Sequence, residues 1–165
     1  MPDSDSFDAF YRGTRQRLFD CLVGITGNRA EAQDVVHEAY ARAWQRWQTV
    51  GDYADPEAWV RTVARRLAVS QWRRARSALR AHRRTGPTPP VRGPDVELMT
   101  LVAALGKLPM KQREAIVLHH LMGLPVTQIA REIGAPEGTV KARLARGRQA
   151  LAALLAVDLP EESHV

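Results

Sequence analysis

The C-terminal third of the chain carries small and apolar residues at a spacing that fits two helices packed around a tight turn. Ala130 is a small residue where two helices could touch, and Gly134, four positions later, can adopt the left-handed backbone conformation that such a turn needs. Val140 is placed to point back into a core shared with Ile129 and Ile133. This arrangement is a helix-turn-helix, so the chemistry expected here is recognition of double-stranded DNA.

The second helix of this pattern presents a cationic surface opposed only by Glu137. A recognition helix turns its N-terminal residues toward base edges in the major groove, whereas contacts to phosphates position the protein without reading sequence. We therefore expect base contacts from Thr139, Lys141, Ala142 and Arg146, and phosphate contacts from Arg143 and Arg148. A basic face that is only solvated is the alternative.

A second cationic group lies in the middle of the chain. Residues 57–94 contain 10 arginines and one acidic residue, a net charge of +9, whereas residues 1–56 carry 6 basic and 9 acidic residues and residues 95–165 carry 8 of each. Charge concentrated in this way is typical of polyanion binding, and the alternative is a solvated face or a disordered tail.

Three aromatic residues, Tyr53, Trp59 and Trp72, stand within or beside this basic segment. Stacking of an unpaired base on an aromatic ring contributes about 1–3 kcal/mol, so the segment could hold single-stranded DNA. The competing interpretation is packing in a core. We favour the core for Trp44, Trp47 and Trp59, whereas for Trp72, which precedes Arg73 and Arg74, the two interpretations stay balanced.

Helical periodicity recurs along the chain, and no segment alternates as a strand would. A first helix is expected from Phe7 to the glycines at 24–27, a second after a capping Asn28, and a third after Asp55-Pro56, a strong signal for a helix start. Further helices are expected over residues 98–105, from 108 to 122, and over 126–133 and 137–155.

Arginine and proline dominate residues 76–94, and proline at this density blocks helix continuation, so an extended, flexible linker is expected there. The predicted fold class is therefore all-α. Two small helical domains, residues 5–75 and 95–157, are joined by this linker, and the C-terminal domain is a helix-turn-helix.

Composition excludes several classes of protein. The longest apolar run, residues 150–157, is far shorter than the roughly 20 residues of a membrane helix, and the acidic N-terminus does not resemble a signal peptide. We expect a cytoplasmic protein without membrane insertion, in which the single Cys21 is structural.

No constellation of catalytic or metal-binding residues stands out. The five histidines share no metal-ligand spacing, and the neighbours His119 and His120 are expected to point to different faces of a helix. The remaining three are His37, His82 and His164. Since a phosphate-binding glycine loop is also missing, we expect no cofactor, no metal and no enzymatic activity.

The whole chain resembles the bacterial sigma factors of the extracytoplasmic-function group in the sigma-70 family. The resemblance runs from about Phe7 to Leu155 and depends on four stretches in order. They are residues 32–44 (AQDVVHEAYARAW), 56–68 (PEAWVRTVARRLA), 108–117 (LPMKQREAIV) and 137–144 (EGTVKARL). These look like the polymerase-binding helix, the promoter-melting helix, the opening of the second domain and the recognition helix of that family.

The resemblance implies a subunit that binds RNA polymerase core, recognises promoter DNA and helps to melt it. Its contacts with the clamp helices of the largest polymerase subunit would come from Asp34, His37, Glu38 and Arg42, with His37 standing where the family usually has Gln. The unpaired strand of the minus-ten element would meet Tyr53, Trp59, Arg61, Arg65 and Arg66, joined by Trp72, Arg73 and Arg74. The last helix would read the minus-thirty-five element. The polymerase flap and an anti-sigma factor are further partners that the resemblance suggests.

Two other functions compete with this interpretation. A free-standing helix-turn-helix regulator would bind operators without polymerase core, but it would need a dimerisation or ligand-sensing surface, and the sequence indicates neither. An enzyme acting on nucleic acid is disfavoured because active-site residues are missing.

Overall fold

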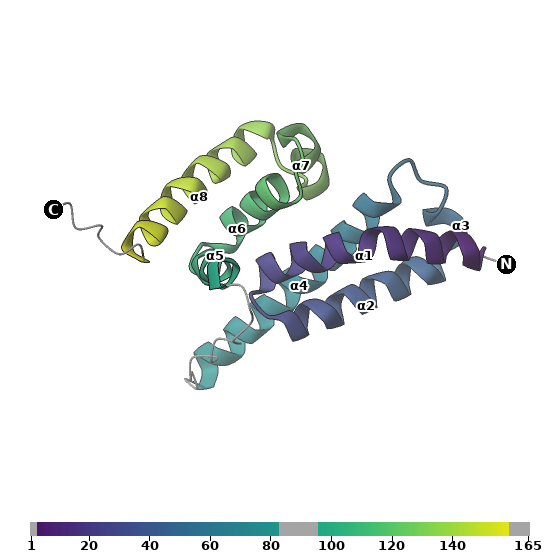
Figure 1. The fold of residues 1–165 in the computed structure, drawn as a ribbon, viewed down its shortest axis with the longest axis horizontal. Helices are drawn as coiled ribbons and strands as arrows, with labels where there is room; N and C mark the ends of the chain where they lie inside the picture. Colours follow the sequence, from purple (N-terminus) through teal and green to yellow (C-terminus); the bar gives the residue numbers. More distant parts are fainter. Residues whose placement is uncertain (1–2, 83–95, 159–165) are drawn as a thin grey trace. The chain divides into compact units, whose positions relative to one another are not determined.

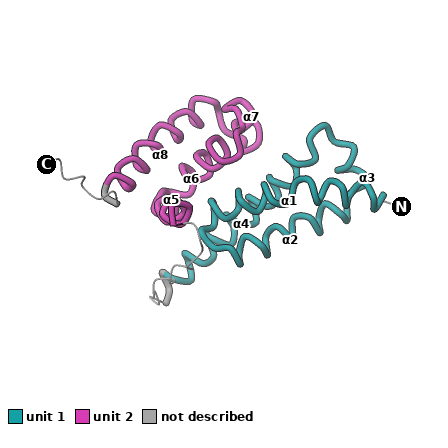
Figure 2. Tube along the Cα trace, viewed as in Figure 1, with its two compact units in different colours: residues 1–87 teal, residues 88–165 magenta. Residues whose placement is uncertain are grey.

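The computed structural model describes residues 3–82 and 96–158, and within these ranges every regular element is a helix (Figure 1). This confirms the all-α fold class. The chain forms two compact units, residues 1–87 and 88–165 (Figure 2). Among the described residues, no helix is both long enough and apolar enough to cross a membrane.

The first unit is built on three long helices that pack against one another in pairs. Its elements are α1 (Ser4–Thr26), α2 (Arg29–Gln45), the short α3 (Trp47–Val50) and α4 (Pro56–His82). The central helix α2 buries Ala32, Ala39 and Ala43 completely. Because these side chains are small, α1 and α4 can approach α2 closely on either side.

The helix starts in this unit follow the capping residues seen in the sequence. The side chain of Asn28 accepts a hydrogen bond from the backbone N–H of Glu31, and that of Asp55 accepts one from Ala58 at 3.0 Å. Gly27 ends α1 with φ of +69°, a conformation that costs glycine little. The predicted bounds of α1 and the predicted starts of α2 and α4 are therefore confirmed to within a few residues.

An aromatic cluster closes the end of the unit where the chain turns from α2 into α3. Trp47 is 6% exposed and donates a hydrogen bond from Nε1 to Ser6 Oγ at 2.8 Å, which confirms its predicted place in the core. The hydroxyls of Tyr40 and Thr14 lie 2.6 Å apart, and burial raises the pKa of Tyr40 to about 12. Trp44 differs from the prediction, since 39% of it is exposed and it lies at the rim of the cluster.

The helix α4 is longer than the sequence suggested. It continues to His82, so residues 76–82, which we expected to open an extended linker, are helical. The reason is compositional, because these seven residues include no proline and are mainly arginine, alanine and leucine, which are good helix formers. The rest of the expected linker, residues 83–94, lies outside the described residues.

The second unit contains α5 (Val96–Gly106), α6 (Met110–Ile116), the π-helical turn η1 (Val117–Leu121), α7 (Val126–Ile133) and α8 (Glu137–Asp158). The predicted helix-turn-helix is α7 and α8. Gly134 has φ of +69° at the turn, and Ala130 and Val140 are buried between the helices together with Ile129. Each of these residues was predicted for its place.

A buried arginine ties α6 to the end of α5. Arg113 is 4% exposed, and its Nη2 atom donates hydrogen bonds to the carbonyl oxygens of Gly106 and Leu108 at 2.9 and 3.1 Å. Carbonyls at a helix C-terminus lack partners within the helix, so the guanidinium stabilises the turn between α5 and α6.

The helices α6 and α8 cross at a glycine. A Cβ atom added to Gly147 would lie 2.8 Å from Cγ1 of Ile116, which is itself 3% exposed. We expect Gly147→Ala to destabilise the second unit by up to about 2 kcal/mol, because overpacking costs about 1–3 kcal/mol and outweighs the roughly 1 kcal/mol that alanine gains in a helix.

Chemical denaturation followed by circular dichroism measures this effect. Gly138→Ala is the matched control, since that glycine lies in the same helix with open space around it. A Gly147→Ala protein as stable as the control would contradict the close crossing of the two helices.

Candidate nucleic-acid interfaces

One face of α2 is exposed and charged. Its exposed residues include Asp34, His37, Glu38 and Arg42, for which the resemblance implied contacts with a partner. Arg42 donates a hydrogen bond from Nε to Glu38 Oε1 at 2.9 Å. An exposed pair at this spacing adds only about 0.2–0.5 kcal/mol to the helix, so both side chains can exchange their partner at little cost.

Beside this charged face runs an open groove of about 360 Å³ between α1 and α2. Phe7 and Tyr11 line it from α1, and His37, Tyr40 and Trp44 line it from α2. Since His37 belongs to both, the aromatic groove and the charged face form one continuous surface. The groove was not expected from the sequence, because Trp44 was predicted to lie in the core.

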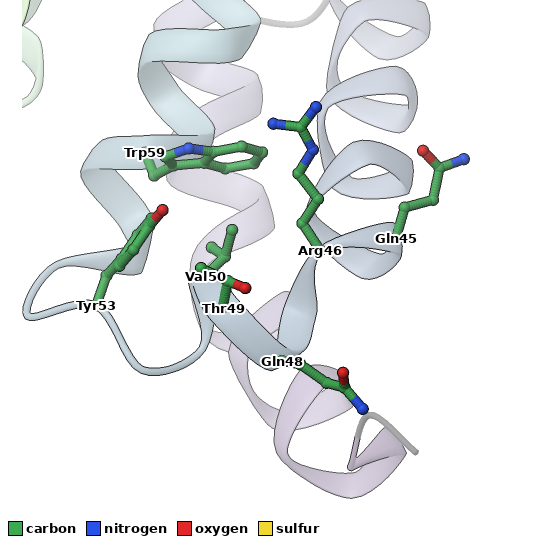
Figure 3. Close-up of a pocket in the computed structure, with 7 residues that line it drawn as sticks. All are labelled: Gln45, Arg46, Gln48, Thr49, Val50, Tyr53 and Trp59. Atoms are coloured by element: carbon green, nitrogen blue, oxygen red, sulfur yellow. The ribbon is translucent and has the colours of Figure 1, made fainter.

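A second pocket, of about 330 Å³, lies where α2, α3 and the loop before α4 meet (Figure 3). Tyr53 and Trp59 line one side of it, and Arg46 stands on the other. Tyr53 is 45% exposed and Trp59 is half-buried. The pocket therefore offers aromatic surface and a cation to a planar, anionic ligand, and Trp59 lines it instead of filling the core.

Four polar residues of this pocket were missed by sequence reasoning: Gln45, Arg46, Gln48 and Thr49. Their amide, guanidinium and hydroxyl groups are those that hydrogen-bond base edges. Gln45 and Arg46 separate two tryptophans that fit a single helical stripe, and Gln48 and Thr49 directly follow the second of them. The signal that could have found all four is this position. The stripe is interrupted here by the end of α2 at Gln45.

The helix α4 sorts the predicted strand-binding residues onto two faces. Trp59, Arg66 and Arg73 are spaced by seven residues, which is close to two helical turns, so they share one face. Arg66 and Arg73 are exposed, as is Arg74, which lies one position further along and donates a hydrogen bond to Ser70 Oγ at 3.2 Å. These arginines extend from the pocket along α4.

The remaining candidates lie on the other face of α4. Arg61 and Arg65 are 3% and 6% exposed, so the structure does not support the expectation that their guanidinium groups face DNA. They share the side of the helix on which Ala64 and Ala68 are buried. Trp72 is half-buried and lies under the guanidinium of Arg76, whose Cζ is 5.2 Å from the ring centroid, so one ring face is already covered.

In the second unit, the exposed side of α8 carries four of the six predicted contacts, namely Lys141, Ala142, Arg146 and Arg148. Thr139 and Arg143 are only half-exposed. Because Lys141 and Arg148 are seven residues apart, they share one edge of this side, whereas Ala142 and Arg146, one turn apart, share the other.

His119 and His120 differ from the prediction that they point to different faces of a helix. Their ring centroids are 4.8 Å apart in an edge-to-face arrangement, although we expected them to diverge. The reason is that they lie in the π-helical turn η1, where the backbone departs from the α-helical spacing. No group of three His, Cys, Asp or Glu side chains in residues 3–82 and 96–158 is arranged to hold a metal ion.

Comparison with known proteins identifies relatives of both units. Residues 10–78 match the family model "Sigma-70 region 2", and residues 98–151 match "Sigma-70, region 4". The chain is 36% identical over 135 residues to the ECF RNA polymerase sigma factor SigL of Mycobacterium tuberculosis, covering 77% of this chain and 76% of the relative. It is 32% identical to the ECF RNA polymerase sigma factor EcfG of Rhodopseudomonas palustris, covering 98% and 92%.

A solved structure has the same fold over most of its length. This is the sigma factor RpoE of Bartonella quintana, determined in complex with the anti-sigma factor NepR. The TM-score is 0.76 at 25% sequence identity, and the match covers 93% of this chain and 98% of that one.

Proposed function

The chain belongs to the extracytoplasmic-function sigma factors of the sigma-70 family, which bind RNA polymerase and give it promoter specificity, and we propose how its two units divide that work. The first unit binds polymerase core and holds the unpaired strand of the minus-ten element. The second unit reads the minus-thirty-five element as duplex. The observation that carries this assignment is the aromatic pocket at Trp59, which continues into the exposed arginines of α4.

The contact with polymerase core is assigned to the exposed face of α2. Asp34 and Glu38 supply carboxylates, and Arg42 and His37 flank them. The largest subunit, through its clamp helices, is the proposed partner of this face, and the flap is the proposed partner of the second unit. Paired charges of this kind set orientation and association rate more than affinity, so the adjoining aromatic groove would add apolar contact area.

The minus-ten contact is assigned to the pocket of Figure 3 and the face of α4 beyond it. An unpaired base would enter between Tyr53, Trp59 and Arg46, and the backbone of its strand would follow Arg66, Arg73 and Arg74. This combination of a stacking surface with a cationic track is how proteins hold single strands. Arg61 and Arg65 are left out because they are buried.

The minus-thirty-five contact is assigned to α8. Its exposed Lys141, Ala142 and Arg146 lie near the helix N-terminus, where a recognition helix meets base edges. Arg143 and Arg148 are assigned to phosphates, and Thr139 stays a base contact at the half-exposed start of the helix.

Two further properties are proposed by analogy with the family. An anti-sigma factor would hold the chain inactive, as a partner of the kind that NepR is for the Bartonella quintana protein. The chain would act in the cytoplasm, where polymerase and promoters are. Sigma factors are non-enzymatic regulators, so no reaction is assigned to this chain.

Transcription reconstituted from purified parts tests the proposal. The full chain is combined with polymerase core and a library of promoters with randomised minus-ten and minus-thirty-five elements, and the transcripts are sequenced. We expect transcripts that require the chain and share both elements. Tight binding of the chain to duplex without core, and no chain-dependent transcripts, would support a free-standing regulator instead.

The recognition helix gives a specific prediction. Arg146→Ala should relax selection at one position of the minus-thirty-five element and weaken promoter use by about 1–3 kcal/mol, because a bidentate contact to a base is lost. Repeating the library selection with this variant measures both effects. Gln149→Ala, an exposed neighbour on the same helix, is the control, and an unchanged minus-thirty-five preference with Arg146→Ala would contradict the assignment.

A further inference from the structure

Arg148 is held by a residue outside the helix-turn-helix. Its Nε atom donates a hydrogen bond to Nε2 of His120 at 3.0 Å, and the two residues are 28 positions apart in sequence. His120 lies in the π-helical turn η1, and Arg148 lies on α8. The bond uses Nε of the guanidinium and leaves its two terminal amino groups available, and those groups together bind a phosphate in a fork.

The ring of His120 is itself held in place by a neighbouring residue. Its ring packs edge-to-face on the ring of His119, and Nδ1 of His119 lies 2.8 Å from the carbonyl oxygen of Leu124, to which it donates a hydrogen bond. A chain of contacts thus runs from the loop before α7 through both imidazoles to Arg148. Burial, together with the neighbouring His119 and Arg148, lowers the pKa of His120, which favours the neutral ring whose Nε2 can accept the hydrogen bond.

The backbone brings these groups together. Gly147 precedes Arg148 and has no side chain, which lets α8 approach Ile116, the residue just before η1. The π-helical turn then displaces the histidines from the positions they would hold in a regular α-helix. Turns of this type are frequent at functional sites, and here the turn places an acceptor opposite a cationic side chain of the recognition helix.

We propose that His120 is a positioning residue for DNA binding, which orients the guanidinium of Arg148 toward one phosphate of the promoter duplex. The proposal depends on the function assigned above to α8. His120 need not touch DNA, and its effect passes through Arg148. An exposed arginine without this partner would sample many rotamers, and ordering it would then reduce the affinity for the phosphate.

Neutralised phosphates test this role in the complete complex of chain and polymerase core. The probe is a promoter from the library selection, prepared with single methylphosphonates along the minus-thirty-five region. We expect one position at which neutralisation weakens binding of the unmodified protein by about three- to tenfold. Arg148→Ala and His120→Ala should bind the normal and the neutralised promoter almost equally at that position, and His120→Gln should recover the difference because its amide oxygen accepts the same hydrogen bond.

The outcomes distinguish a failure of the positioning role of His120 from a failure of the assignment of α8 as the recognition helix. His120→Ala with full sensitivity at the position that Arg148→Ala loses would overturn the positioning role while leaving α8 as the recognition helix. A His120→Gln protein as insensitive as His120→Ala would overturn it as well. Lys141→Ala is the matched control, since Lys141 is assigned to base edges and its loss should leave the sensitivity at this phosphate unchanged. A failure of the assignment of α8 would instead be seen in the library selection, as an unchanged promoter choice with Arg146→Ala.

Discussion

Replacing Glu38 by arginine is expected to weaken the association of the chain with polymerase core by at least about tenfold, or about 1.4 kcal/mol. Glu38 is exposed and accepts a hydrogen bond from Arg42. The substitution removes a carboxylate from the proposed interface and places a second guanidinium beside the first. A cationic group of the partner that pairs with Glu38 would then meet a like charge, which costs several kcal/mol, whereas the loss of the intrahelical pair costs about 0.5 kcal/mol.

Competition for limiting core against labelled wild-type chain measures this effect. Asp20→Arg is the matched control, since it makes the same change of charge on an exposed residue of α1 outside the proposed surface. Circular dichroism should show both variants folded. Equal competition by the two variants would exclude the exposed face of α2 as the core-binding surface.

Replacing Arg113 by methionine is expected to destabilise the second unit by about 2–4 kcal/mol. The two hydrogen bonds of the charged guanidinium contribute about 1.5–3 kcal/mol each, and part of that loss is offset because methionine buries no charge. Methionine fills much of the same space but donates no hydrogen bond to the carbonyls of Gly106 and Leu108. Because a whole domain is stable by only about 5–15 kcal/mol, a unit this small would lose a large part of its stability.

The chain offers a way to assign the loss to one unit. All 10 aromatic residues precede position 73, so tryptophan fluorescence reports on the first unit alone, whereas circular dichroism reports on both. Arg113→Met should lower the midpoint seen by circular dichroism and leave the fluorescence midpoint unchanged. Lys111→Met, on the exposed side of α6, should change neither. Coincident shifts of both signals would contradict a local role for Arg113.

The parts of the fold that were predicted well depend on local chemistry. Asn28, Asp55 and Gly134 act through hydrogen bonds or backbone angles within a few residues, and these can be read from sequence spacing. The end of α4 was predicted poorly because the prolines that break helices begin only at residue 87. Ten arginines in one segment indicated a site for a polyanion but could not show which of them face outward.

Which arginines of α4 face outward depends on how the helix is rotated about its own axis relative to the core. Val60, Ala64 and Ala68, each one turn apart, are buried and define the inner face. Arg61 and Arg65 each come one position after a residue of this inner face and lie beside it, whereas Arg66 lies on the opposite side of the helix. The seven-residue spacing from Trp59 to Arg66 and Arg73 was available in the sequence, but the pocket beside Trp59 was not, since it forms only where α2 ends.

The helix α4 runs without interruption over 27 residues, about 40 Å, so it fixes the spacing of the side chains on its exposed face as well as presenting them. One inserted residue between Trp59 and Arg66 would rotate every later side chain by 100° and carry Arg66 and Arg73 out of line with the pocket. Substitutions along this face can be tolerated one by one, but a change in its length alters the whole register at once. Evolution can therefore substitute residues in this helix far more freely than it can insert or delete one.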